Sequence, residues 1–167
     1  MTETMTLNTA MGTEKAPHRV LFVCTGNTCR SPMAAALLLD LAASRGLMLT
    51  ASSAGIYAAE GAPISENAAN ALLRAGVADT PQNHYTAHTA RRVTEEMIAK
   101  TDEVVALSDT HAFELLMRFP AYAGKISTLA LNIPDPFGGD QAEYDACLAT
   151  LSLCVGMRWD TEARGED

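Results

Sequence analysis

The sequence predicts an α/β fold, a single domain in which helices cover both faces of a parallel sheet in three layers. Short apolar runs rich in β-branched residues alternate with stretches in which apolar residues recur at helical spacing. Strands separated by helices pair in parallel through right-handed crossovers, and such sheets bind ligands at the carboxyl ends of their strands. The 167 residues also suit one domain with a sizeable core.

The first predicted strand is followed by a turn and a helix. Residues 19–23 are a short β-branched and aromatic run, apolar on both faces as in a central strand. After the turn, Pro32 suits the first turn of a helix. Apolar residues then recur at helical spacing from Met33 and stop near Gly46, which predicts the end of that helix. Residues 47–53 are the second predicted strand.

The rest of the chain continues the alternation. Residues 65–75 predict a helix that begins at a Ser65 cap and ends at Gly76. Thr94 is the expected cap of a short helix whose first turn carries two glutamates, at its positive end. The remaining predicted elements are a strand at 103–107, a helix at 110–119, a strand at 125–129, a loop at 132–140 and a helix at 141–159.

The composition of the chain indicates which classes of partner it does not bind and in which cellular compartment it is expected. The net charge of −8 and the pI near 4.9 argue against nucleic acid and anionic membrane as partners. No apolar stretch approaches the ~20 residues of a membrane span. Residues 1–18 are polar and predict a disordered tail rather than a signal peptide, the domain is expected at 19–160, and 161–167 form a second tail. With its four cysteines interpreted as free thiols, the chain is predicted to be cytoplasmic.

The turn "CTGNTCRSP", residues 24–32, predicts a phosphate site. A loop between a strand and a helix N-terminus can point its backbone N–H groups at a tetrahedral anion. Gly26 permits the positive φ that such a turn often needs, and Asn27 tolerates left-handed backbone. Arg30, six residues after Cys24, can grip two phosphate oxygens.

The same turn predicts nucleophilic chemistry. The amides and the helix end would lower the pKa of Cys24, and Ser31 could donate a hydrogen bond to its sulfur. A thiolate that attacks phosphorus gives a cysteinyl-phosphate, and one carboxylic acid can protonate the leaving atom and then activate water. Asp135, in "DPFGGD", is the candidate acid. Asp140 competes with it, but fits better as the cap of the last helix.

The other cysteines have less specific interpretations. Cys29 is either a small buried residue or a resolving thiol that protects Cys24 as a reversible disulfide. Cys147 and Cys154 are seven residues apart and therefore share one helix face, where buried apolar thiols are expected.

Further polar side chains are expected outside the site. Arg91 and Arg92 are interpreted as a solvated or salt-bridged pair, and Tyr57 either as core or as a wall of the site. Surface or capping roles, with no metal-ligand spacing, are expected for three histidines: His84, His88 and His111.

At this point the sequence resembles a known family. "VLFVCTGNTCRSPMA", "SSAG", "HTARRVTEEM" and "DPFGGD", in this order, are similar to the low-molecular-weight protein tyrosine phosphatases over residues 19–159. The resemblance implies a four-stranded parallel sheet of order 2-1-3-4, no metal and no other cofactor. It implies Cys24 as nucleophile, Arg30 as phosphate clamp and Asp135 as general acid. It also implies a phosphate-binding loop completed by Thr25, Gly26, Asn27, Thr28, Cys29 and Ser31.

Two residues favour a particular branch of this family. Tyrosine-directed members commonly carry isoleucine where this chain has Thr28, and often two aromatic residues where it has Phe137 and then glycine. Threonine resembles the protein arginine phosphatases, because its hydroxyl could polarise water or accept from a guanidinium. We therefore expect a monomeric enzyme that acts on phosphoarginine in phosphorylated proteins, with tyrosine phosphatase as the alternative.

Two other functions have less support. Arsenate reductases with this fold relay oxidation through extra cysteines after the third strand, and none lies between Ala54 and Gln141. A metal-binding or redox-sensing module could use the four cysteines. Such a module would not require Arg30 or Asp135.

Overall fold

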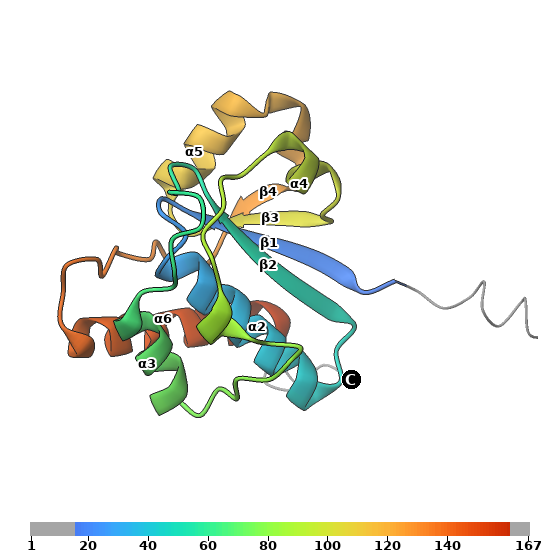
Figure 1. The fold of residues 1–167 in the computed structure, drawn as a ribbon. Helices are drawn as coiled ribbons and strands as arrows, with labels where there is room; N and C mark the ends of the chain where they lie inside the picture. The colour runs from blue at the N-terminus through green and yellow to red at the C-terminus, as the bar shows by residue number, and fades with distance from the viewer. Residues whose placement is uncertain (1–15, 161–167) are drawn as a thin grey trace, which may run out of the picture.

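The computed structural model describes residues 16–160 and contains a four-stranded sheet of order β2-β1-β3-β4 (Figure 1). All neighbouring strands pair in parallel, which confirms the predicted fold class and strand order. Most of the predicted N-terminal tail (residues 1–15) and the predicted tail 161–167 lie outside the described residues. No helix within 16–160 is long and apolar enough to span a membrane.

The central strand β1 is apolar on both faces, as its sequence predicts. It runs from His18 to Cys24, and its side chains alternate between two cores. Val20 and Phe22 face one core, while Leu21 and Val23 face the other. The other strands are β2 (Leu49–Gly55), β3 (Glu103–Ala106) and β4 (Ile126–Thr128).

Helices cover both faces of the sheet (Figure 1). In this view α2, α3 and α6 lie below the sheet, and α4 and α5 lie above it. Their bounds are Arg30–Arg45 for α2, Glu66–Arg74 for α3, Glu95–Ala99 for α4, Asp109–Arg118 for α5 and Gln141–Trp159 for α6. Two 3-10 turns complete the chain, Tyr85–Ala87 and Pro120–Lys125.

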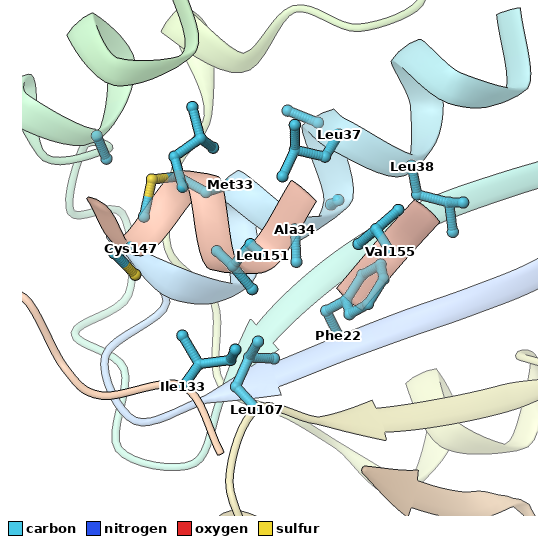
Figure 2. Close-up of a cluster of buried hydrophobic side chains, with 14 of the residues drawn as sticks. Phe22, Met33, Ala34, Leu37, Leu38, Leu107, Ile133, Cys147, Leu151 and Val155 are labelled. Carbon is cyan, nitrogen blue, oxygen red and sulfur yellow. The ribbon is translucent and has the colours of Figure 1, made fainter. Parts of the chain in front are cut away.

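The larger core lies between the sheet, α2 and α6 and is mainly aliphatic (Figure 2). Met33 and Leu38 of α2 pack there with Leu151 of α6, and each is fully buried. Phe22 meets Trp159 edge to face, with ring centroids 5.7 Å apart. This packing fixes the start of α2, and with it the loop that joins α2 to β1.

The observed helix ends test the predicted caps. Gly46 ends α2 in the left-handed conformation, at φ 65°. Thr94 and Asp140 each accept a hydrogen bond from a backbone N–H of the helix that follows, as predicted. Ser65 is the N-cap residue of α3, as predicted, but its side chain makes no cap hydrogen bond. Instead its backbone N–H donates to the carbonyl of Thr28 at 2.9 Å, which ties α3 to the loop after β1.

Strand β2 begins later than predicted and continues through Gly55, which pairs with Cys24. At this position the loop after β1 crosses the backbone of β2 closely. A Cβ on Gly55 would lie 2.6 Å from the carbonyl oxygen of Thr25 and 3.0 Å from the Cβ of Asn27. A side chain here would therefore displace the loop.

We predict that Gly55→Ala lowers the free energy of unfolding by about 1 to 3 kcal/mol, because the methyl group overpacks against backbone. Gly156→Ala is the matched control, since nothing lies within 4 Å of its added Cβ. That change should raise stability by about 0.5 to 1 kcal/mol, because alanine favours the interior of α6. Urea unfolding measures both variants. An unchanged stability of Gly55→Ala would contradict the close approach.

Candidate active site

The loop between β1 and α2 turns at Asn27. This residue has φ 59°, the left-handed region, while Gly26 is not among the residues with positive φ. A Cβ on Gly26 would meet only the Thr28 hydroxyl oxygen, at 3.9 Å. Gly26 therefore does not adopt the positive φ that it permits, and the expectation that Asn27 tolerates left-handed backbone is confirmed. Asparagine takes this role because its short polar side chain tolerates left-handed backbone and hydrogen-bonds locally.

Asn27 is fully buried and is held by its side chain. Its amide nitrogen donates to the Ser31 hydroxyl at 2.8 Å and to the Ser53 hydroxyl at 2.9 Å. Its side-chain oxygen accepts from the backbone N–H of Arg91 at 3.0 Å. Because these partners belong to α2, β2 and the segment before α4, one side chain joins three parts of the fold to the loop.

Cys24 is the last residue of β1 and is buried, with its sulfur 2.9 Å from the Ser31 hydroxyl. Burial raises the pKa of Cys24 above its ordinary value. Hydrogen bonds from Ser31, the charge of Arg30 and a backbone hydrogen bond from Asn27 lower that pKa but do not outweigh burial. The sequence-based expectation of a lowered pKa is thus wrong in direction, although the predicted contact with Ser31 is present.

Arg30 is the first residue of α2, and only 6% of its surface is exposed. Its Nη1 donates to the carbonyl oxygen of Ile133 at 3.0 Å, and its Nη2 to the Thr25 hydroxyl at 3.4 Å. Nη2 also lies 3.4 Å from the Oδ2 of Asp135. The guanidinium is therefore held by the loop on one side and by the segment before α6 on the other.

A cavity of about 200 Å³ lies at the carboxyl end of β1, where parallel sheets bind ligands. Asp135 reaches it with 49% of its side-chain surface exposed, and its Oδ1 accepts from the backbone N–H of Phe137 at 3.0 Å. Phe137 is largely exposed at the rim. The lining residues are Cys24, Thr25, Gly26, Asn27, Thr28, Cys29, Arg30, Asp135 and Phe137. These include every predicted site residue except Ser31, which is fully buried and contacts the Cys24 sulfur.

Cys29 lies at the junction of the loop and α6. Its sulfur is 3.7 Å from the Thr28 hydroxyl and 3.4 Å from the Tyr144 hydroxyl. Burial, followed by the contact with Cys29, raises the pKa of Tyr144 to about 12. All four cysteines are free and buried, which confirms the expectation for Cys147 and Cys154.

Two of the three histidines expected in surface or capping roles contact the loop. His88 donates its Nε2 proton to the carbonyl of Asn27 at 2.7 Å, and burial lowers the pKa of this imidazole. His111 is 6% exposed, and its Nε2 lies 2.8 Å from the Thr25 hydroxyl. A usable signal existed for His111, since the helix after the third strand begins at the same sheet edge as the loop. No comparable signal existed for His88.

Of the two arginines before α4, Arg92 is exposed, as the solvated interpretation predicts, whereas Arg91 is half-buried. Both bind backbone carbonyls. Arg91 donates its Nε to the carbonyl of Ser53 at 3.0 Å, and Arg92 its Nε to that of Ala58 at 2.9 Å. Tyr57 is neither core nor cavity wall: it is exposed, bonded to Glu114 at 3.2 Å, with the Arg118 guanidinium over its ring.

Within residues 16–160 there is no group of three or more His, Cys, Asp or Glu side chains that could hold a metal ion. The four cysteines lie in this part of the chain, so they do not form the cluster that a metal-binding module would need.

Comparison with known proteins identifies the relatives of this chain. The family model described as "Low molecular weight phosphotyrosine protein phosphatase" matches residues 19–156. A protein-arginine-phosphatase of Geobacillus stearothermophilus is 38% identical over 146 residues, which are 83% of this chain and 92% of that protein. The low molecular weight protein-tyrosine-phosphatase Ptp of Acinetobacter johnsonii is 32% identical over 140 residues, 81% of this chain and 92% of that protein.

A solved structure extends the comparison to the site. It is a cysteine-to-serine mutant of YwlE arginine phosphatase with a phosphorylated active-site serine. The two chains are 30% identical, with a TM-score of 0.77, over 86% of this chain and 95% of that one.

We predict that Ser31→Ala raises the pKa of Cys24 further, because the thiolate loses a hydroxyl donor that lowers this pKa. The measurement is the rate of iodoacetamide alkylation at Cys24 against pH, since only the thiolate reacts. Ser53→Ala is the matched control: it removes the other hydroxyl bonded to Asn27 but does not touch the sulfur. An identical alkylation midpoint in Ser31→Ala and the wild type would contradict this role.

Proposed function

Since the chain belongs to the low molecular weight phosphotyrosine protein phosphatase family, we propose that it hydrolyses phosphoarginine in proteins through a cysteinyl-phosphate. Membership makes it a phosphoprotein phosphatase, the class that the predicted function named. One observation carries the finer proposal: a single cavity is lined by Cys24, Arg30 and Asp135 and, beside them, by Thr28.

The phosphoryl group binds between the loop and Arg30. The positive end of α2 points at this cavity, because α2 begins at Arg30. The buried guanidinium adds a full positive charge and N–H donors in a planar fork, which suits two phosphoryl oxygens. The chain as a whole carries a net charge of −8. The site is therefore a local exception that selects an anion.

In the first step Cys24 attacks phosphorus in its thiolate form, which Ser31 and the charge of Arg30 favour against the effect of burial. An S–P bond forms and the P–N bond breaks. Asp135, in its carboxylic acid form, donates its proton to the departing guanidine nitrogen. In the second step Asp135 accepts a proton from water, and the resulting hydroxide attacks phosphorus while the S–P bond breaks. Phosphate leaves and the thiolate is restored. The Ser31 hydroxyl, 2.9 Å from the sulfur, stabilises the thiolate in both steps.

Thr28 is the proposed selector of the substrate. It lines the cavity, and its own carbonyl is bonded to Ser65, so its position is fixed by α3. A hydroxyl at this place can accept from a guanidinium or orient water, whereas a larger aliphatic side chain would fill the space and suit a phenyl ester. The relatives at 38% and 35% identity are both named protein-arginine phosphatases, which supports this choice. The alternative is a tyrosine phosphatase, the name of the relative at 32% identity.

We also propose that Cys29 is the resolving thiol of a reversible disulfide with Cys24, since both are buried, free and in the same loop. Free thiols throughout the chain favour a cytoplasmic location. We propose that the enzyme acts as a monomer on phosphorylated proteins, without nucleic acid, membrane or metal.

We predict a kcat/KM at least tenfold higher for phosphoarginine peptides than for phosphotyrosine peptides of the same sequence, and a reversed or lost preference in Thr28→Ile. Thr28→Ser and Thr28→Val are the matched controls, because the first keeps the hydroxyl and the second keeps the shape. Steady-state kinetics with both peptides measures the preference.

Two outcomes would remove this assignment. A wild-type preference for phosphotyrosine would establish the tyrosine phosphatase instead. A Thr28→Ile variant that keeps the arginine preference would show that another residue selects the substrate.

We predict that Asp135→Asn lowers kcat about 10² to 10³-fold, because an amide can neither donate the acid proton nor activate water. Asp140→Asn is the matched control in the same loop. It caps α6, and asparagine caps a helix as well as aspartate does, so kcat should stay near the wild-type value. Equal kcat values for the two variants would overturn the role of Asp135.

A further inference from the structure

A buried histidine outside the loop reaches the arginine clamp through one intermediate side chain. His111 of α5 contacts the Thr25 hydroxyl, and this hydroxyl accepts from Nη2 of Arg30. We propose that His111 is a positioning residue which, through Thr25, holds the Arg30 guanidinium in the direction that binds the phosphoryl group. This inference rests on the phosphatase function proposed above.

The imidazole of His111 is fixed at both nitrogens. Its Nε2 lies 2.8 Å from the Thr25 oxygen, and its Nδ1 lies 2.9 Å from the Ser108 hydroxyl. Ser108 is the N-cap of α5, and its oxygen also accepts from the backbone N–H of His111 at 3.3 Å. The ring therefore cannot rotate without losing two hydrogen bonds, and the cap ties its position to the start of the helix.

Thr25 needs such an anchor, because it is an exposed residue whose hydroxyl could otherwise turn into solvent. Its backbone is held by Tyr57, whose N–H donates to the Thr25 carbonyl at 2.9 Å. That contact does not fix the side chain. The contact with His111 does, and it keeps the oxygen on the side of Arg30, 3.4 Å from Nη2. In either tautomer of the imidazole, the Thr25 oxygen keeps a lone pair for the guanidinium.

Of the three groups that accept hydrogen bonds from Arg30 or lie beside it, only Asp135 changes its charge during the proposed reaction. The carbonyl of Ile133 accepts from Nη1 at 3.0 Å and, as a backbone group, carries no charge that the reaction could change. Asp135 lies 3.4 Å from Nη2, but it is half exposed and changes its charge during the proposed reaction. When Asp135 is protonated or turned to the leaving group, Thr25 is the neutral acceptor that still holds Nη2. The link through His111 therefore keeps the guanidinium of Arg30 aligned while Asp135 transfers its proton.

The protonation state of His111 is compatible with its role in positioning Arg30. Burial and the charge of Arg30 lower the pKa of His111 to about 4, against an opposing effect of Asp135. The imidazole is thus neutral at pH 7 and does not repel the guanidinium. A permanently charged neighbour at the same place would weaken the clamp.

The test measures binding of inorganic phosphate to the full-length protein by titration calorimetry at pH 7. His111→Leu and Thr25→Val break the link and should each weaken phosphate binding about 3- to 10-fold. The double variant should be no weaker than the single ones, because both changes break the same link. His111→Gln and Thr25→Ser keep a hydrogen-bonding group at each position and should restore binding to within about twofold of the wild type.

A merely structural role would lower the melting temperature without this pattern of loss and rescue, so thermal unfolding is recorded for every variant. His84→Leu is the matched control, since His84 bonds to Asp79 at an exposed site and has no contact with Thr25 or Arg30 among those described. Phosphate affinity that is unchanged in Thr25→Val, or additive losses in the double variant, would overturn the inference. The proposed function fails separately, if the wild type binds phosphate but hydrolyses neither phosphopeptide. Absence of phosphate binding to the wild type would overturn both.

Discussion

The site depends on one buried residue, Asn27, held in the left-handed conformation. Its side chain bonds to α2 and β2 and to the backbone before α4, and its carbonyl accepts from His88. A loop that lies between a strand and a helix would otherwise have many conformations. With Asn27 fixed, Cys24 at the end of β1 and Arg30 at the start of α2 line the same cavity. The shape of the phosphate site is therefore set before a ligand binds.

Residues from other parts of the fold complete the site around this loop. Gly55 leaves room for the loop to cross β2, and the segment that follows α3 brings His88 and Arg91 beneath it. On the opposite side, α5 and the segment before α6 bring His111 and Asp135 to Arg30. These segments meet because the carboxyl ends of parallel strands lie along one edge of the sheet. The nucleophile Cys24 and the clamp Arg30 come from one loop, whereas the acid Asp135 comes from a distant segment that ends at the same edge of the sheet.

The sequence predicts the parts of the site that depend on local order. Cys24, Arg30 and Ser31 belong to one strand, loop and helix, so their proximity follows from spacing, and Asp135 follows from the likeness of its loop to a family motif. His88 and His111 could not be predicted in the same way. Their partners are 61 and 86 residues away, and each contact is one hydrogen bond that depends on the packing of whole elements. The pKa of Cys24 was predicted in the wrong direction for a related reason, because burial is a property of the assembled core rather than of the turn.

The central claim is that Cys24 becomes covalently phosphorylated in the loop that Asn27 holds. Rapid mixing of the protein with a phosphoarginine peptide, followed by denaturation within one turnover and mass spectrometry of the digested chain, tests it directly. The account predicts a phosphoryl group on the peptide that contains Cys24, which accumulates further in Asp135→Asn if the second step slows more than the first. Turnover without any covalent phosphoryl group, or a group on a different residue, would contradict it.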